Sequence, residues 1–287
     1  MSDINNKNNS GVGKAYLSIL NIVTIVCIIV GSMVHIGGFI GKAAVGTTRF
    51  FGGIISKNAA TDKDGGATLD SFVKADINLS VGDLEIVYGD TFSIDAKGYT
   101  EETFPTWKVS GNKLTVTQKN EYVWRPLGVG AFPSDDSRLT ITIPKGTMID
   151  LEADLNMGSI RLSDISFKNI DLDADMGSVK LSGIACENIN ITAEMGSIDL
   201  KSVTFASGDF NASMGSITLS DITCKSAECD ASMGKIEASG TIGSLEADCS
   251  MGSVVVNTDN ENAKLDLESD MGSVKVNGKD CGKSYKN

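Results

Sequence analysis

Apolar and polar positions alternate in three short runs that recur along residues 151–280. Each repeat carries the sequence Met-Gly-(Ser/Lys)-(Ile/Val), and positions are counted here from this methionine as zero. In the repeat around Met176, apolar residues stand at −6, −4, −2 and 0, then at +3 and +5, and then at +8 and +10. Alternation with period two indicates half-buried β-strands. Each repeat therefore predicts three short strands that keep one face inward.

The motif occurs seven times, at steps of 19, 19, 19, 19, 18 and 20 residues. The copies begin at Met157, Met176, Met195, Met214, Met233, Met251 and Met271. A fixed period of this length is typical of a solenoid, in which each coil packs only against its neighbours. We expect an all-β fold, a single-stranded parallel β-helix whose strands stack about 4.8 Å apart.

The alternation assigns the seven methionines to one column inside the coils. We interpret this column as core filling by a flexible side chain rather than as a metal-binding role. The glycine after each methionine is expected at a corner of the coil, because glycine accepts backbone angles that a Cβ forbids.

Most of the cysteines fall at inward positions of the same pattern. Position +10 holds Cys186, Cys224 and Cys281, position −4 holds Cys229, position −2 holds Cys249, and Cys27 lies in an apolar N-terminal run. Phenylalanine and alanine occupy these positions in other repeats, so cysteine acts there as a small apolar residue. We therefore expect free buried thiols, which weakly favour a reducing or oxygen-poor setting.

Residues 15–41 contain no charged residue over 27 positions, which is long enough to cross a bilayer of about 30 Å. We expect a single-pass transmembrane helix here, with cleavage as a signal peptide as the alternative. Residues 1–14 form a short polar tail, and residues 42–70 a juxtamembrane segment and flexible linker. The lysines and arginines on the two sides do not decide the orientation. His35, the only histidine, is interpreted as a membrane-boundary residue.

Residues 71–150 read as strands separated by turns and are expected to form an irregular β capping region. Within it, Val81-Gly82-Asp83-Leu84 looks like a diverged Met-Gly-Ser-Ile corner, so the solenoid could begin there. The apolar, aromatic insertion 121–132 is expected either to fold over the end of the core or to form a contact surface. The regular coils occupy residues 151–280, and residues 281–287 are expected to be a tail.

Several of these segments together resemble a known family. They are a Gly-Asp-Leu-Glu-Ile strand at 82–86, a Leu-Thr-Val strand at 114–116, an Arg-Leu-Thr-Ile-Thr-Ile-Pro-Lys-Gly segment at 138–146, and the Gly-Ser-(Ile/Val) coils. With the N-terminal anchor, they resemble the bacterial β-strand-repeat domains named "putative adhesins", over roughly residues 70–280. The resemblance implies a bacterial cell-envelope protein and supplies no catalytic or ligand residues. The methionine before each Gly-Ser and the 121–132 insertion depart from the family pattern.

The outward positions −5, −3 and −1 are acidic at 14 of 21 sites, with no lysine or arginine. We name as weak metal or cation candidates Asp171, Asp173, Asp209, Glu228, Asp230, Glu246 and Asp248. Like charges stacked on adjacent strands repel one another. The columns are either a solubilising surface, consistent with the net charge of −12, or a loose site for divalent cations or a basic envelope polymer or protein.

Other chemistry is not apparent. The sequence holds no P-loop, dinucleotide fingerprint or Cys/His metal cluster, and no cofactor is expected. The acidic surface argues against nucleic-acid binding. We expect a membrane-anchored, non-enzymatic β-solenoid in the cell membrane, with the solenoid extracellular, that acts as a binding or spacer module. The alternatives are a cytoplasmic-side scaffold or envelope-stress sensor and, far behind, a carboxylate-based carbohydrate-active enzyme.

Overall fold

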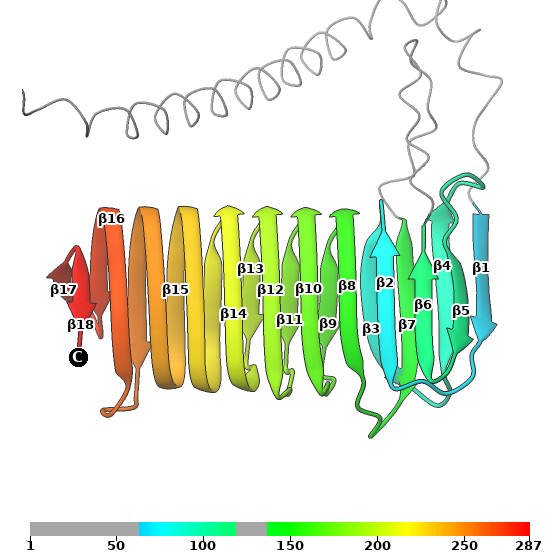
Figure 1. Cartoon of the computed structure of the whole chain (residues 1–287), viewed down its shortest axis with the longest axis horizontal. Coiled ribbons are helices and arrows are strands. Elements are labelled where there is room, and N and C mark those ends of the chain that lie inside the picture. The colour runs from blue at the N-terminus through cyan, green and yellow to red at the C-terminus, as the bar shows by residue number, and fades with distance from the viewer. Residues whose placement is uncertain (1–62, 119–136) are drawn as a thin grey trace, which may run out of the picture. The chain divides into compact units, whose positions relative to one another are not determined.

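The computed structural model describes residues 63–118 and 137–287, in which strands wind into a row of stacked coils (Figure 1). Each regular coil has three sides, one for each run of alternating residues in the repeat. The first side is formed by β8 (Asp150–Met157), β10 (Asn169–Met176), β12 (Asn188–Met195) and β14 (Thr204–Met214) in successive coils. The second sides are β9 (Ile160–Ser163), β11 (Val179–Ser182) and β13 (Ile198–Lys201). From there β15 (Ile217–Thr258) runs round successive corners as one continuous strand, and after a short turn β16 (Lys264–Val276) runs round a further corner.

Neighbouring coils pair in parallel and in register. Leu172 of β10 lies between Ala153 of β8 and Ile191 of β12, one repeat away on each side. The third side of the first coils is reduced to single bridges, Ser166 to Ala185 and Ala185 to Thr204. The predicted all-β solenoid with about 19 residues per coil is confirmed.

The core of each coil is built from the inward positions of the pattern. In the coil of Met176, Ile170, Leu172, Ala174, Val179 and Leu181 are all at most 2% exposed. One inference about the core is wrong, because the methionine column is on the surface. Met176 and Met195 are 43% exposed, Met251 is 39% and Met271 is 64% exposed. The inward alternation stops at position −2, and the chain turns the corner at the methionine.

The glycine at +1 is required by close contact between backbones. A Cβ on Gly177 would lie 1.6 Å from the carbonyl oxygen of Gly158, and one on Gly196 would lie 1.6 Å from that of Gly177. Only some of these glycines have a positive φ, such as Gly158 at 140°. The corner therefore selects glycine mainly because no side chain fits between successive coils.

The coil that comes first in the sequence does not lie at the end of the stack but between two other layers of strands. It consists of β2 (Lys74–Leu79) and β3 (Asp83–Gly89), and it pairs with β8 and β9 on one side. Its other side pairs in parallel with β6 (Lys113–Thr117) and β7 (Arg138–Pro144). The amide of Gly82 donates to the carbonyl of Met157 at 2.9 Å, so the predicted Val81–Leu84 corner stacks on the regular ones.

Antiparallel strands cover both ends of the stack. At one end β4 (Ser93–Tyr99) pairs with β7, β1 (Lys63–Thr68) with β4, and β5 (Thr106–Ser110) with β6. At the other end β17 (Lys279–Gly282) and β18 (Ser284–Lys286) pair with β16. Both capping units use residues that the sequence suggested were linker (42–70) or tail (281–287). The edges of the parallel coils are thereby paired, and the edges left open belong to the short strands β1, β5, β17 and β18.

Several sequence-based expectations fall outside the described residues. They are the polar tail 1–14, the transmembrane helix 15–41 with Cys27 and His35, most of the linker 42–70, and the whole insertion 121–132. Across residues 63–118 and 137–287, the structure has no helix long and apolar enough to span a membrane.

Candidate functional site

The parallel register brings the acidic candidates together into two columns on the first side of the coils. Asp171 lies beside Glu152 and Asn190, and Asp209 lies beside Glu228 in the column at −5. In the column at −3, Asp173 lies beside Asp154 and Asp230 lies beside Asn211. All seven candidate side chains, from Asp171 to Asp248, are exposed. We call these two columns the acidic face.

Lysines close the acidic face at both ends, which the sequence pattern missed. Lys113 of β6 lies 2.7 Å from Asp76, which stands beside Glu152 in the −5 column. Lys286 of β18 pairs with Asp266 at the other end. Both lysines come from strands next to the regular coils, so the 19-residue pattern could not assign them to this surface. The carboxylates between these two ends have no ion pair among the described residues.

Asparagine side chains relieve part of the repulsion along the columns. The side-chain amide of Asn190 donates to Asp171 at 2.9 Å, and that of Asn211 donates to Asp209 at 2.8 Å. Where carboxylates stack directly, the repulsion remains. Burial and then the neighbouring carboxylates Asp154 and Asp175 raise the pKa of Asp173. The pKa of Glu228 is raised first by the charge of Asp209.

These shifts predict a dependence of stability on pH. A carboxyl whose pKa is higher in the folded protein binds its proton there before it does in the unfolded chain, so its destabilising charge is lost as the pH falls through the folded pKa. We therefore expect the melting temperature to rise by a few degrees as the pH is lowered from 7 into the range in which Asp173 and Glu228 take up protons. Thermal melts across this range check it. The Asp173→Asn variant should melt higher than the wild type at pH 7 and show a smaller rise, and a melting temperature that falls steadily from pH 7 would contradict the prediction.

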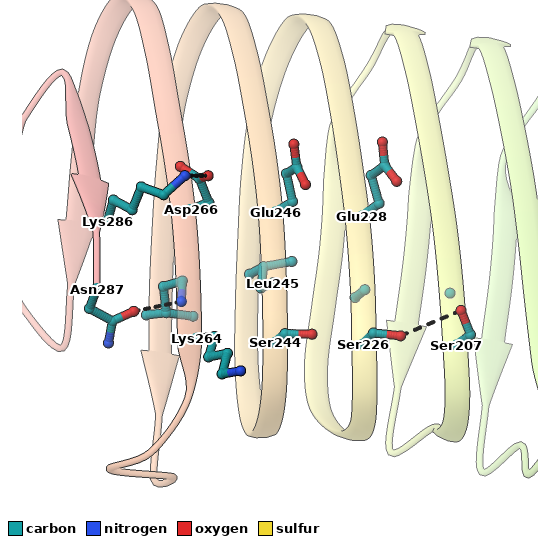
Figure 2. Close-up of a pocket in the computed structure, with 13 residues that line it drawn as sticks. Ser207, Ser226, Glu228, Ser244, Leu245, Glu246, Lys264, Asp266, Lys286 and Asn287 are labelled. Carbon is teal, nitrogen blue, oxygen red and sulfur yellow. Dashed lines mark hydrogen bonds and ion pairs between the residues drawn. The ribbon is translucent and has the colours of Figure 1, made fainter.

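A shallow groove of about 400 Å³ runs beside the −5 column of the acidic face near its C-terminal end. Its floor includes Gly208 and Ala227, where the neighbouring coils carry Ile189 and Leu245. In Figure 2, the serines Ser207, Ser226 and Ser244 form one row, and Glu228, Glu246 and Asp266 form the row beside it. Hydroxyls and carboxylates in two parallel rows can accept hydrogen bonds from an extended ligand that carries several amino groups.

The geometry does not provide a compact metal centre. In the part of the chain that the structure describes, no three His, Cys, Asp or Glu side chains are grouped so that they could hold one metal ion. Each carboxylate column instead presents its charges at about the strand spacing, 4.8 Å. Cations would therefore be attracted collectively along the face.

The cysteines of the solenoid are not paired with one another. Cys186, Cys224, Cys229, Cys249 and Cys281 are all free, and the structure buries Cys224, Cys229 and Cys249. Burial raises the pKa of Cys186 to about 12 and also raises that of Cys229. Burial likewise raises the pKa of Cys224 and Cys249, so these four thiols are not activated thiolates.

We expect the buried thiols to be inert in the native protein. At pH 8, Cys229 and Cys249 should react with a thiol reagent at least about tenfold more slowly than in denaturant, because they are protonated and shielded from solvent. Mass spectrometry of labelled peptides measures both rates. Rapid native labelling of Cys229, or a Cys229–Cys249 bridge, would contradict the assigned positions.

Comparisons with known proteins agree with this architecture. Residues 72–286 match the family described as Toastrack DUF4097. A "putative adhesin" from Bacteroides fragilis has a similar structure, with a TM-score of 0.56 and 16% identity over 76% of this chain and 98% of that one.

Two further solved structures are similar over 76% of this chain and 97% of theirs, both at 15% identity. One is a "putative adhesin" from Parabacteroides merdae (TM-score 0.47), and the other is a "putative lipid binding protein" from Parabacteroides distasonis (TM-score 0.45). No curated protein sequence gives a significant match. The likeness to the Bacteroides fragilis protein, at 16% identity, shows the fold alone, and the family resemblance expected from the sequence is confirmed by the match over residues 72–286.

Proposed function

Because the chain belongs to the Toastrack DUF4097 family, we propose that it is a membrane-anchored, non-enzymatic binding module of the bacterial cell envelope. The acidic face carries this proposal. Its carboxylates stack from coil to coil between Lys113 and Lys286, and their mutual repulsion lowers stability unless positive charge is bound. Its ligands are divalent cations or a basic polymer or protein of the envelope.

The shape of the coils supports binding rather than catalysis. Consecutive sides in residues 150–220 are joined by only a few residues, so no long loops rise beside the acidic face to wall off a reaction from water. The groove in Figure 2 is lined by serines, carboxylates and two lysines, and no histidine stands among them. An open row of charges is suited to holding an extended partner. The membrane anchor in the proposal rests on the uncharged segment 15–41.

A comparison of salts tests the acidic face. The full chain, purified in detergent, is melted in NaCl and in CaCl₂ or MgCl₂ at matched ionic strength, because monovalent salt alone already screens exposed charges. We expect a higher melting temperature in the divalent salts. Equal melting temperatures would mean that the carboxylates are only a solvated surface.

Matched variants locate the effect. The triple variant Asp209→Asn, Glu228→Gln, Glu246→Gln removes three charges from the acidic face. It should melt at the same temperature in divalent salt and in NaCl of matched ionic strength. The control Glu101→Gln, Glu102→Gln, Glu261→Gln removes the same charge from exposed sites elsewhere. It should still melt at a higher temperature in divalent salt than in NaCl. If divalent salt still raised the melting temperature of the first variant, or no longer raised that of the control, the stabilisation would depend on net charge rather than on the acidic face.

Protease treatment of intact cells tests the location. If the solenoid is outside the cell, cleavage in residues 42–62 of the predicted linker, ahead of β1, should release a folded C-terminal fragment into the medium. If it is released only after lysis, the alternative of a cytoplasmic-side scaffold or sensor holds instead. The five free thiols of the described residues favour that alternative, because oxidising compartments usually pair cysteines.

A further inference from the structure

The exposed methionines form a continuous row that neither the core nor the acidic face explains. We call Met157, Met176, Met195, Met214, Met233, Met251 and Met271 the methionine ladder. Four of them are 39–64% exposed, and the other three are partly exposed. Core filling, which the alternation suggested, therefore does not account for them.

Methionine is retained in this row while the rest of the repeat varies. From −7 to +5, only the methionine at 0 and the glycine at +1 are the same in all seven repeats. Even the inward position −4 changes among Ala, Leu, Ile, Phe and Cys. The glycine is explained by the close backbone contact at Gly177 and Gly196. An exposed corner position would accept many side chains, so the packing of the fold gives no reason for seven thioethers.

The backbone holds the methionines in register. Met176 lies directly beside Met157 and Met195, and Met214 lies beside Met195 and Met233. The amide of Gly177 donates to the carbonyl of Met195 at 3.2 Å, and that of Gly158 donates to the carbonyl of Met176 at 3.1 Å. These bonds fix the spacing of the ladder at about the strand separation of 4.8 Å.

This spacing suits shared coordination of one ion by neighbouring sulfurs. With metal–sulfur bonds of about 2.3 Å, two sulfur ligands of one ion lie at most about 4.6 Å apart. A methionine side chain has three rotatable bonds, so two Sγ atoms attached about 4.8 Å apart can reach that separation without backbone movement. The carboxylates of Asp175, Glu194 and Asp270 directly precede three of the methionines and add negative potential beside the ladder.

We propose that the methionine ladder binds soft monovalent cations, Cu(I) above all, through the thioethers of neighbouring coils. Thioether sulfur selects Cu(I), whereas hard divalent cations prefer oxygen ligands. The protein thus carries two cation-binding surfaces of different chemistry, and this one does not depend on the proposed role of the acidic face.

Methyl NMR of the full chain in detergent tests the proposal, with methionine labelled at the ε-methyl carbon and Ag(I) as an air-stable probe. The reference is Met148, which is 50% exposed and outside the ladder. Because the chain has six cysteines, Ag(I) is added until the accessible thiols are saturated and the titration is then continued, while the buried thiols of Cys224, Cys229 and Cys249 stay shielded in the core. Multivalent contacts raise avidity by about 10²–10⁴-fold. The ladder methyls should therefore shift at Ag(I) concentrations at least about a hundredfold lower than that of Met148.

Paired variants show whether the ladder acts as a unit. Met157→Leu with Met195→Leu keeps the apolar side chains and removes the sulfurs on both sides of Met176, so the shift of Met176 should require more Ag(I). Met148→Leu should leave the ladder titration unchanged. If the ladder and Met148 titrate together, if no ladder methyl shifts, or if the double variant titrates as the wild type does, the proposal is wrong. Circular dichroism of each variant confirms that the comparison is between folded proteins.

Discussion

Substituting Gly196 with alanine should lower the free energy of unfolding by at least about 3 kcal/mol, the upper end of the usual cost of overpacking. The added Cβ would lie 1.6 Å from the carbonyl oxygen of Gly177, and that oxygen belongs to a backbone fixed by the neighbouring coil. Relief requires two coils to move apart, which weakens the parallel pairing between them. Denaturant unfolding followed by circular dichroism measures the loss.

Gly111→Ala is the matched control, since nothing lies within 4 Å of a Cβ at this position. Its φ of 57° makes alanine unfavourable for a different reason, at a cost of about 1–2 kcal/mol. The two variants therefore separate lack of space from backbone conformation. If Gly196→Ala proved no more destabilising than Gly111→Ala, the close stacking of the corners would be incorrect.

Ile217→Asp should prevent stable folding, whereas Met195→Asp should be tolerated. Ile217 is fully buried at the inward position +3, so an aspartate there would be a charge without a partner or would have to take up a proton. Met195 is 43% exposed, and a surface substitution usually changes stability by only about 0.5 kcal/mol. Thermal melts of both variants check the difference.

This pair of variants also decides between two registers of the coil. A register in which alternation continues through position 0 would bury Met195 and make both aspartates equally damaging. Similar melting temperatures for the two variants would restore that register and remove the basis of the methionine ladder.

The sequence allowed the repeat and most of its faces to be predicted, because each coil repeats the same alternation. The positions of Leu172, Val179 and Leu181 in the core follow directly from that pattern. Met176 was placed wrongly because alternation alone does not show where a strand ends and a corner begins. At the corner the backbones of successive coils lie so close that Gly177 has no room for a side chain beside Gly158, and Met176, next to this turn, is 43% exposed.

The order of the coils in space could not be predicted. β2 and β6 carry similar alternating patterns, and either could have stacked directly on β8. The actual arrangement, with β2 between β6 and β8, depends on contacts between segments far apart in the sequence. For the same reason the sequence indicated the two acidic columns but not Lys113 and Lys286 at their ends, because both lysines lie outside the regular repeat.

The position of β2 between two parallel neighbours makes the solenoid resist a pulling force unequally at its two ends. A pull on the chain ahead of residue 63 would detach β1, whose one partner among the described strands is β4, and would then have to shear β2 from β6 and β8 together. A pull on the C-terminus meets β18 and β17, each of which pairs, in the described part of the chain, with β16 alone, and can then unwind the coils one after another. A tether at the N-terminal side would therefore load the protein through its mechanically stronger end.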